Sequence, residues 1–201
     1  MKLSTALSAL AGASTWSLLE HVIHEQLGHV HIRHRNVFSV EHTKHHATTH
    51  YFAPTVKKIG AAALTTTAVG PLATLALGRR RGAAFTVGLV GMYATYEFLH
   101  RRAHTHGPNG RYGRWMRKHH FHHHFHNPKV NHGVTSPLWD RVRHTYEAPS
   151  QVRVPEKHAM PWLVDPESGE VRPEHANDYV LVKKKKKHRA RARPGPVAVA
   201  S

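Results

Sequence analysis

Two long apolar stretches, separated by only three residues, constrain this chain more than any other feature. Residues 59–78 (IGAAALTTTAVGPLATLALG) contain no charged side chain, and residues 82–99 (GAAFTVGLVGMYATYEFL) contain one, Glu97. A helix of about 20 residues crosses the ~30 Å hydrocarbon core of a bilayer, because each residue adds about 1.5 Å. Since only Arg79–Arg81 separate the stretches, they predict a helical hairpin in a membrane.

A weaker apolar stretch at residues 3–20 is rich in Ser and Thr. It fits either a short signal peptide or a third, uncleaved membrane helix. We favour the membrane helix, because the stretch runs directly into the first group of histidines. With three spanning helices, residues 20–58 and all residues from 100 onward lie on the same side of the membrane.

The distribution of positive charge predicts which side that is. Of the 29 Lys and Arg residues, only Lys2 and Arg79–Arg81 fall on the opposite side. Because Lys and Arg near membrane helices concentrate in the cytoplasm, the side that carries all 23 histidines is expected to be cytoplasmic. The arginine triplet on the other side argues mildly against this orientation.

Composition excludes several kinds of site and partner. The chain has no cysteine, which excludes disulfides, thiolate-bound zinc, iron–sulfur clusters and thiolate-bound haem. The net charge is +17, and much of it lies in residues 183–193 (KKKKKHRARAR). No recognised nucleic-acid-binding motif accompanies this charge, so we expect no specific nucleic-acid partner.

The chain divides into three parts by composition. Residues 1–146 form the expected membrane-embedded domain, residues 147–182 a short extension, and residues 183–201 a disordered basic tail that faces lipid. In the extension, a Pro-Glu-Ser-Gly turn separates two short semi-apolar runs. This pattern predicts a small β-hairpin or an irregular loop packed on the core, without chemistry of its own.

Histidines recur at the spacing of metal ligands. The clusters are His24-x4-His29, His42-x2-His45-His46, His100-x3-His104 and HHFHHHFH at residues 119–126. Helix positions i, i+3 and i+4 share one face, so such runs aim several imidazoles at a common point, and imidazole suits zinc, iron or copper. A single cluster is more often a surface pair, but four clusters on one membrane face predict an intramolecular metal site.

The order of these clusters resembles a known family. Together with the closing run NHGVTSPLWDRV at residues 131–142, they resemble the fatty acid hydroxylase/sterol desaturase superfamily over residues 19–146. The resemblance implies an all-α integral membrane fold with a cytosolic, histidine-rich cap over a dinuclear metal centre. It also implies two iron ions as cofactors (zinc is possible in purified protein), O2 as cosubstrate, and hydroxylation or desaturation of a lipid C–H bond.

The resemblance also selects among the histidines of the fourth cluster. The sequence alone permits two H-x2-H-H readings, which begin at His119 or at His120. Counting back from Gly133, as in the family, favours the second, and His119, His122 and His126 are then expected either to surround the ligands without binding the metal or to face solvent. The expected metal ligands are therefore His24, His29, His42, His45, His46, His100, His104, His120, His123 and His124.

The family arrangement divides these ten histidines into two sets of five. The expected first set is His24, His42, His45, His120 and His123, and the second is His29, His46, His100, His104 and His124. Because imidazole must be neutral to bind a metal, the site is expected to lose metal as the pH falls below about 6.5.

Metal-bound histidines usually donate their second ring N–H to an acceptor. The acids within a few residues of the clusters are Glu20, Glu25, Glu41, Glu97 and Asp140. We favour Glu20, Glu97 and Asp140, and Glu97 most of all, because it precedes His100 by one helical turn at a membrane boundary. The Trp139-Asp140 pair is expected to lock the cap rather than contact substrate.

Electrons for this chemistry must come from a partner, because the chain has no flavin or haem domain of its own. We expect a ferredoxin, or a b-type cytochrome with its reductase. The candidate docking residues are Arg101, Arg102, Arg111, Arg114, Arg117 and Lys118, although lipid headgroups are an alternative contact for them. A lipid tail is expected to enter between the apolar hairpin and the first helix.

Three other functions remain open. A carotenoid-type ring hydroxylase shares the size and most of the histidine pattern, but it usually has one more residue in the third cluster and lacks GVTSPLWD. A lipid desaturase is the second. The third is a non-enzymatic, histidine-rich membrane protein that stores zinc or nickel, which would tolerate any histidine spacing.

Overall fold

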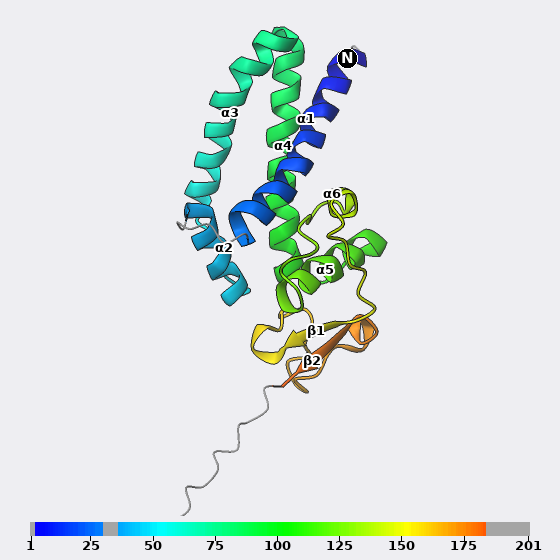
Figure 1. Ribbon diagram of the computed structural model, residues 1–201. Coiled ribbons are helices and arrows are strands. Elements are labelled where there is room, and N and C mark those ends of the chain that lie inside the picture. Colours follow the sequence, from blue (N-terminus) through cyan, green and yellow to red (C-terminus); the bar gives the residue numbers. More distant parts are fainter. Residues whose placement is uncertain (1–2, 30–35, 184–201) are drawn as a thin grey trace, which may run out of the picture.

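The computed structural model describes residues 3–29 and 36–183. Three long helices form one half of the molecule, and shorter helices with a two-stranded sheet form the other (Figure 1). The long helices are α1 (Leu3–Ile23), α3 (Thr55–Leu77) and α4 (Arg79–Thr105). The other half contains the helices α2 (Val37–Ala47), α5 (Gly110–Phe125) and α6 (Leu138–Val142), with the strands β1 (Val152–Pro155) and β2 (Tyr179–Val182).

The expected helical hairpin is formed by α3 and α4. The turn between them is a single residue, Gly78, whose φ of 77° is readily adopted by glycine and rarely by other residues. The arginine triplet belongs to the first turn of α4 and not to the connection. Because α4 continues past the apolar stretch to Thr105, it carries His100 and His104 into the other half of the molecule.

Helix α1 packs against α4 through glycines. A Cβ atom added at Gly12 would lie 2.0 Å from the carbonyl oxygen of Phe85, and one at Gly88 would lie 2.0 Å from that of Ala9. Only glycine permits this approach of the two backbones, as in helix pairs within membranes. The contact holds the end of α1, with the first histidine cluster, next to the histidines of α4.

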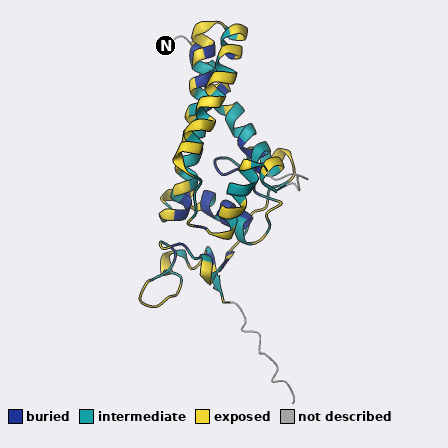
Figure 2. Ribbon diagram, turned by 90° about the vertical axis from the view of Figure 1, so that its left-hand side faces the viewer, coloured by how far each residue is buried: buried dark blue, intermediate teal, exposed yellow. Residues whose placement is uncertain are grey.

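One of the described helices, α3, is long and apolar enough to cross a membrane by itself. Its only buried residue is Ala73, and it exposes Ile59, Leu64, Leu72 and Leu75. Figure 2 shows the exposed faces of the long helices. The expectation of three such helices is therefore met for α3 alone, because Ser and Thr in α1, and Tyr and Glu in α4, reduce the hydropathy of those helices.

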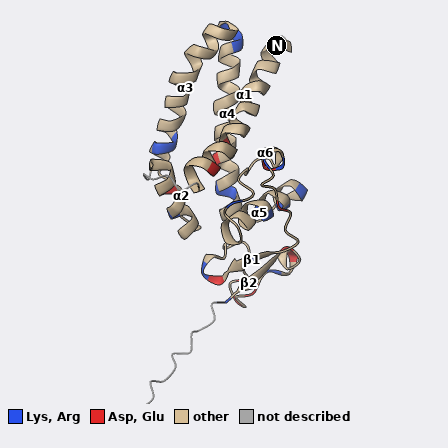
Figure 3. Cartoon of the chain, in the orientation of Figure 1, with Lys and Arg blue, Asp and Glu red and all other residues tan. Residues whose placement is uncertain are grey.

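Charged residues divide along the long axis of the molecule. Figure 3 shows Lys and Arg at the α3–α4 turn and in the half that contains α5, with little charge along the helices between. The N-terminal end of α1 lies at the same end as the α3–α4 turn (Figure 1). Helices α2 and α5 lie at the end opposite the arginine triplet (Figure 1). The predominance of helices confirms the α-helical fold class.

The C-terminal extension packs on α5 and completes the apolar core. That core includes Ala103, Met116, Phe121, Val134, Val152, Val154, Met160, Leu163 and Tyr179. The turn at residues 166–169 forms a minimal antiparallel hairpin, with one bridge between Val164 and Val171. The β1–β2 pair was not expected, and it is parallel because residues 156–178 carry the chain back before β2 begins. Residues 184–201 of the expected tail lie outside the described residues.

Candidate metal centre

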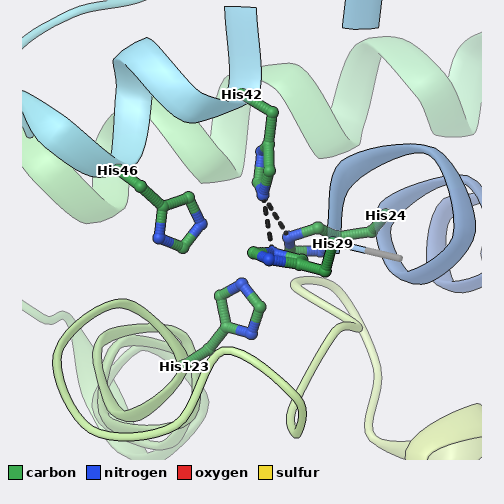
Figure 4. Close-up of side chains that lie close together, drawn as sticks. All are labelled: His24, His29, His42, His46 and His123. Atoms are coloured by element: carbon green, nitrogen blue, oxygen red, sulfur yellow. Dashed lines mark hydrogen bonds between the residues drawn. The ribbon is translucent and has the colours of Figure 1, made fainter. Parts of the chain in front are cut away.

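Ten buried or half-buried histidines form two groups of five where the long helices meet the shorter ones. The first group consists of His24 and His29 from the π-helix η1 (His24–His29), His42 and His46 from α2, and His123 from α5 (Figure 4). The second consists of His45 from α2, His100 and His104 from α4, and His120 and His124 from α5. In each group, the five candidate ligand atoms all lie within 4.8 Å of one another. All ten sequence-predicted ligands are thus brought together.

The π-helix η1 explains the unusual first spacing. In an α-helix, residues five apart point about 140° away from each other, because each residue turns the helix by about 100°. A π-helix has wider turns and i→i+5 hydrogen bonds, so His24 and His29 face the same side. Such segments are rare and occur often at functional sites.

The expected division into two sets is wrong for four histidines. His29 and His46 belong with the first group, and His45 and His120 belong with the second. The reason is local helix geometry, since residues four apart lie almost directly above one another. The i, i+4 pairs in α2, α4 and α5 therefore stay together, whereas the expected sets split the pairs in α2 and α5.

The spacing of the ring nitrogens fits ligands of a metal ion. The Nε2 atom of His42 lies 3.1 Å from Nε2 of His24 and 2.7 Å from Nε2 of His29. In the second group, the corresponding separations are 2.9 Å for His45–His100 and 2.9 Å for His104–His120. Two nitrogens bound at right angles to one ion, each at about 2.1 Å, lie about 3.0 Å apart.

Three histidines have their outer nitrogens fixed by backbone carbonyls. The Nδ1 atom of His24 lies 2.5 Å from the carbonyl of His132, and that of His123 lies 2.7 Å from the carbonyl of Val130. His45 makes the same contact with the carbonyl of Tyr51, at 2.8 Å. A carbonyl only accepts, so Nδ1 carries the proton, and the lone pair of Nε2 faces the other histidines of its group.

Buried ring nitrogens without partners complete the fit. Among the described residues, Nε2 of His46, Nε2 of His123 and both ring nitrogens of His124 are buried without a hydrogen-bond partner. Buried polar atoms are rarely left in this state. A bound cation would give these lone pairs a partner, and an all-imidazole donor set suits iron, zinc or copper. The residues present therefore fit two metal ions.

None of the three favoured acids accepts a hydrogen bond from a candidate ligand, so the predicted role is wrong for Glu20, Glu97 and Asp140. Glu97 forms an ion pair with Lys58. Glu20 accepts from the backbone N–H groups of Val134 and Thr135 and from the hydroxyl of Thr135, so it anchors the GVTS loop. In the described part of the chain, no carboxylate bonds to any of the ten histidines. Carbonyls fill that role for His24, His45 and His123, and no sequence signal could have shown it because every residue has a carbonyl.

Asp140 locks the loop before α6, as expected for the Trp139-Asp140 pair. Its two oxygens accept from the backbone N–H groups of His132 and Gly133, at 2.8 and 2.9 Å. They also accept from the hydroxyl of Thr145 at 2.9 Å, and one lies 3.2 Å from Nε2 of His119. His119 lies outside both groups, so Asp140 holds none of the ten candidate ligands.

The other acids and the remaining histidines of HHFHHHFH also lie outside the two groups. Glu25 pairs with Arg143, and Glu41 pairs with Lys57. His122 lies 2.7 Å from the carboxylate of Glu147, and its ring packs on that of exposed His126. These contacts agree with the family register, in which His120, His123 and His124 are the ligands.

Burial keeps the candidate ligands neutral. Desolvation is the main cause that lowers the pKa of His29 and His45 to about 4 and that of His46 to about 2. The other seven are lowered well below the ordinary value for the same reason. The ten histidines therefore stay neutral, and able to bind a metal, well below the pH of about 6.5 at which the sequence predicted that metal loss begins.

A cavity of about 500 Å³ opens beside both groups. His24, His42, His45 and His100 line it at the metal centre. Its other walls come from the long helices, from α2 and from the segment between α2 and α3, with apolar or aromatic side chains that include Trp16, Phe38, Phe52, Ala61, Leu64, Tyr93 and Tyr96. The cavity lies where the sequence predicted entry of a lipid tail, between the hairpin and the first helix.

Five of the six expected docking residues are at least partly accessible. Arg101, Arg111 and Arg114 are exposed, and Arg102 and Lys118 are half-buried. Arg117 is buried, and its guanidinium donates to the carbonyls of Arg102, His106 and Gly113. Its inclusion is therefore wrong, because the side chain ties α4 to α5 and cannot contact a partner.

These features define a helical protein whose buried histidines form a candidate two-metal centre beside an apolar cavity. A family model described as fatty acid hydroxylase matches residues 9–145. The chain belongs to the fatty acid hydroxylase family, and the resemblance of its histidine clusters to that superfamily is confirmed.

Two known proteins are similar to this chain. A dihydroceramide fatty acyl 2-hydroxylase of Arabidopsis thaliana is 27% identical over 134 residues, which cover 65% of this chain and 56% of the relative. The solved structure of Scs7p, in which only the hydroxylase domain is visible, has a TM-score of 0.58 and 25% identity, and the match covers 76% of this chain and 60% of that one. The chain thus spans somewhat more than half the length of either protein.

Proposed function

We propose that this chain is a lipid hydroxylase that inserts one oxygen atom of O2 into a C–H bond of a fatty-acyl chain at a two-iron centre. The observation that carries the proposal is the pair of buried five-histidine groups, which open together onto one apolar cavity. Family membership supports the reaction class, and the curated relative acts on a fatty acyl group.

Two bound iron ions would supply the reduction of O2, which no amino-acid side chain performs. The ten histidines would hold these ions as neutral donors, and their buried surroundings keep them neutral. The carbonyls of Tyr51, Val130 and His132 hold three of the rings in the orientation that a metal requires. These acceptors are neutral, so the chain leaves the positive charge of the centre largely uncompensated.

The cavity would position the lipid by exclusion of water and by shape. Apolar walls from α1, α3 and α4 suit an acyl chain, and the histidines of both groups lie at the end where a target carbon would stop. Lys58 and Glu97 line the same cavity and form an ion pair with each other. The acyl tail of the lipid would therefore occupy the apolar part of the cavity and extend to the metal centre.

Membrane orientation and the electron donor belong to the same proposal. The exposed apolar side chains of α3 would face lipid, and the histidine half would lie in the cytoplasm. Electrons would come from an acidic ferredoxin or b-type cytochrome. Arg101, Arg111 and Arg114 are the exposed cations on that half from the expected docking set.

The proposal is tested by metal content and product together. Full-length protein in lipid nanodiscs should contain two irons per chain in the ten-histidine centre, and it should hydroxylate acyl lipid when given O2 and electrons. His123→Ala and His104→Ala, one from each group, should each lose metal and nearly all activity. His126→Ala is the matched control from the same histidine run and should keep both.

Other outcomes identify the alternatives. Unchanged metal content in both variants would overturn the histidine centre. A product that has lost two hydrogens and gained no oxygen would indicate a desaturase, and metal without any lipid product would indicate storage. Lipid analysis of a deletion strain, with a search for a missing hydroxylated species, would identify the lipid.

A further inference from the structure

A third cluster of possible metal ligands lies next to the first histidine group. It consists of His21 near the end of α1, His132 in the loop before α6, and Asp140 in α6. Their exposed fractions are 0%, 1% and 0%. One ligand atom from each lies within 4.8 Å of the others. None of the three belongs to the ten histidines discussed above.

The imidazoles of this cluster have no hydrogen-bond partners in the described part of the chain. Both ring nitrogens of His21 and both of His132 are buried and unpartnered. An unsatisfied buried polar atom typically costs about 1–3 kcal/mol, so four on two neighbouring rings, whose centroids lie 5.3 Å apart, call for an explanation. Cation binding would satisfy the nitrogens that face Asp140.

The separations within the cluster are those of metal ligands and not of hydrogen bonds. Nδ1 of His21 lies 3.4 Å from Oδ1 of Asp140, and Nδ1 of His132 lies 3.8 Å from the same oxygen. Hydrogen bonds from nitrogen to oxygen are usually about 2.7–3.2 Å long. Ligands of a tetrahedral zinc ion, each at about 2.0–2.1 Å, are about 3.4 Å apart.

We infer that His21, His132 and Asp140 bind a third metal ion, in addition to the two of the ten-histidine centre. Two imidazoles and one carboxylate suit zinc or ferrous iron and do not suit calcium or magnesium. Glu25 lies 3.7 Å from Nε2 of His21, at the edge of the site, where it forms an ion pair with Arg143.

Hydrogen bonds from neighbouring groups hold the carboxylate of Asp140 in place, as is usual for carboxylates that bind a metal. Its oxygens accept from the backbone N–H groups of His132 and Gly133, which fixes the side chain. The hydroxyl of Thr145 also donates to Oδ1, and it has a second acceptor in the carbonyl of Asp140 at 3.5 Å. The hydroxyl can therefore release Oδ1 to an ion.

The third ion would connect elements far apart in the sequence. His21 belongs to α1 and Asp140 to α6, while His132 lies in the loop between α5 and α6. The carbonyl of His132 also accepts from Nδ1 of His24, a member of the first group. The ion would thus hold the loop that orients a ligand of the neighbouring centre. The inference does not rest on the proposed hydroxylation.

Metal counting tests the inference. The purified full-length chain, loaded with zinc and then desalted, should contain three zinc ions per chain, and His21→Phe and His132→Phe should each contain two. Phenylalanine fills a similar volume, and it preserves the backbone carbonyl at position 132. His106→Phe, at an exposed histidine that belongs to none of the clusters of possible ligands, is the control and should retain three. Two ions in the wild type, with no loss in either folded variant, would overturn the inference.

A second measurement covers variants that fail to fold. Anomalous scattering at the zinc edge from wild-type crystals should show a peak between His21, His132 and Asp140, and its absence would overturn the inference. The test also separates this site from the proposed function. If the wild type contained a single zinc ion and His21→Phe contained none, the two-metal centre would be refuted and the third site would stand.

Discussion

At the scale of single residues, backbone carbonyls decide how three candidate ligands are oriented. His24, His45 and His123 each direct Nδ1 at a carbonyl and Nε2 at their own group. A carboxylate in the same place would add negative charge, whereas a carbonyl fixes the tautomer and adds none. The candidate centre is therefore built from neutral groups throughout, unlike the carboxylate-rich sites of soluble di-iron helix bundles.

Glu20 provides a prediction at this scale. Its carboxylate satisfies the N–H groups of Val134 and Thr135 and the hydroxyl of Thr135, all in a buried setting. Glu20→Ala removes their acceptor, so we expect the free energy of unfolding to fall by at least about 2 kcal/mol. Glu20→Gln keeps one acceptor oxygen and should lose less. Thermal unfolding in detergent measures both, and equal stability of Glu20→Ala and wild type would contradict the anchoring role.

At the scale of elements, two helices serve both metal groups. Helix α2 gives His42 and His46 to one group and His45 to the other. Helix α5 gives His123 to the first group, and His120 and His124 to the second. A helix with histidines at i, i+3 and i+4 presents two directions that differ by less than half a turn. The two groups are therefore neighbours because α2 and α5 both pass between them.

The α1–α4 contact provides a prediction for elements. Gly12→Ala and Gly88→Ala each place a methyl group against a backbone carbonyl, so the helices must separate. We expect each to lower the free energy of unfolding by about 1–3 kcal/mol. Gly91→Ala, in the same helix α4, meets nothing within 4 Å and should be neutral or stabilising by up to about 1 kcal/mol. Thermal unfolding measures all three variants, and equal unfolding midpoints would contradict this packing.

At the scale of the whole molecule, the α3–α4 turn and the helices α2 and α5, which carry six of the ten candidate ligands, lie at opposite ends (Figure 1). The chain has no cysteine, so single introduced cysteines report the side of the membrane. In intact cells, a membrane-impermeant maleimide should label Arg80→Cys and should label Arg111→Cys only after permeabilisation. Wild type is the unlabelled control. The opposite pattern would reverse the orientation, and labelling of both in intact cells would exclude a cytoplasmic histidine face.

Burial of the histidines makes the stability of metal-free protein depend on pH. The pKa of His45 and of His132 is about 4 in the folded chain, mainly through desolvation, against about 6.5 when unfolded. Between these values the unfolded chain binds protons that the folded chain excludes. The free energy of unfolding should therefore decrease as the pH falls from about 6.5 towards 4, and these groups should have no effect above about 6.5.

This dependence is measured by thermal unfolding of metal-free protein at pH about 7.5 and about 5. The midpoint should be lower at pH 5. Protein loaded with metal before the pH is lowered should lose less stability, because bound metal favours the folded state. Equal midpoints for metal-free protein at the two pH values would show that these histidines take up protons without unfolding.

Helix geometry explains which parts of the site were predictable. Eight of the ten candidate ligands follow from i, i+3 and i+4 spacing within α2, α4 and α5, and the choice of His120, His123 and His124 follows from the family resemblance, through the distance to Gly133. His24 and His29 come together only because η1 is a π-helix. The acceptors did not follow, since Glu97 pairs with Lys58 on another helix. Arg117 looked like a surface cation, yet the crossing of α4 and α5 buries it.

The sequence by itself determined the three long helices, the hairpin, the family and the choice of the ten candidate histidines, because these depend on periodicity and on order along the chain. Only the tertiary structure decided how the histidines divide into two groups, which carbonyls orient them, and that His21, His132 and Asp140 meet. Those features depend on how α1, α2, α4 and α5 rotate and cross. That arrangement is set by packing between residues far apart in the sequence, such as Gly12 against Phe85.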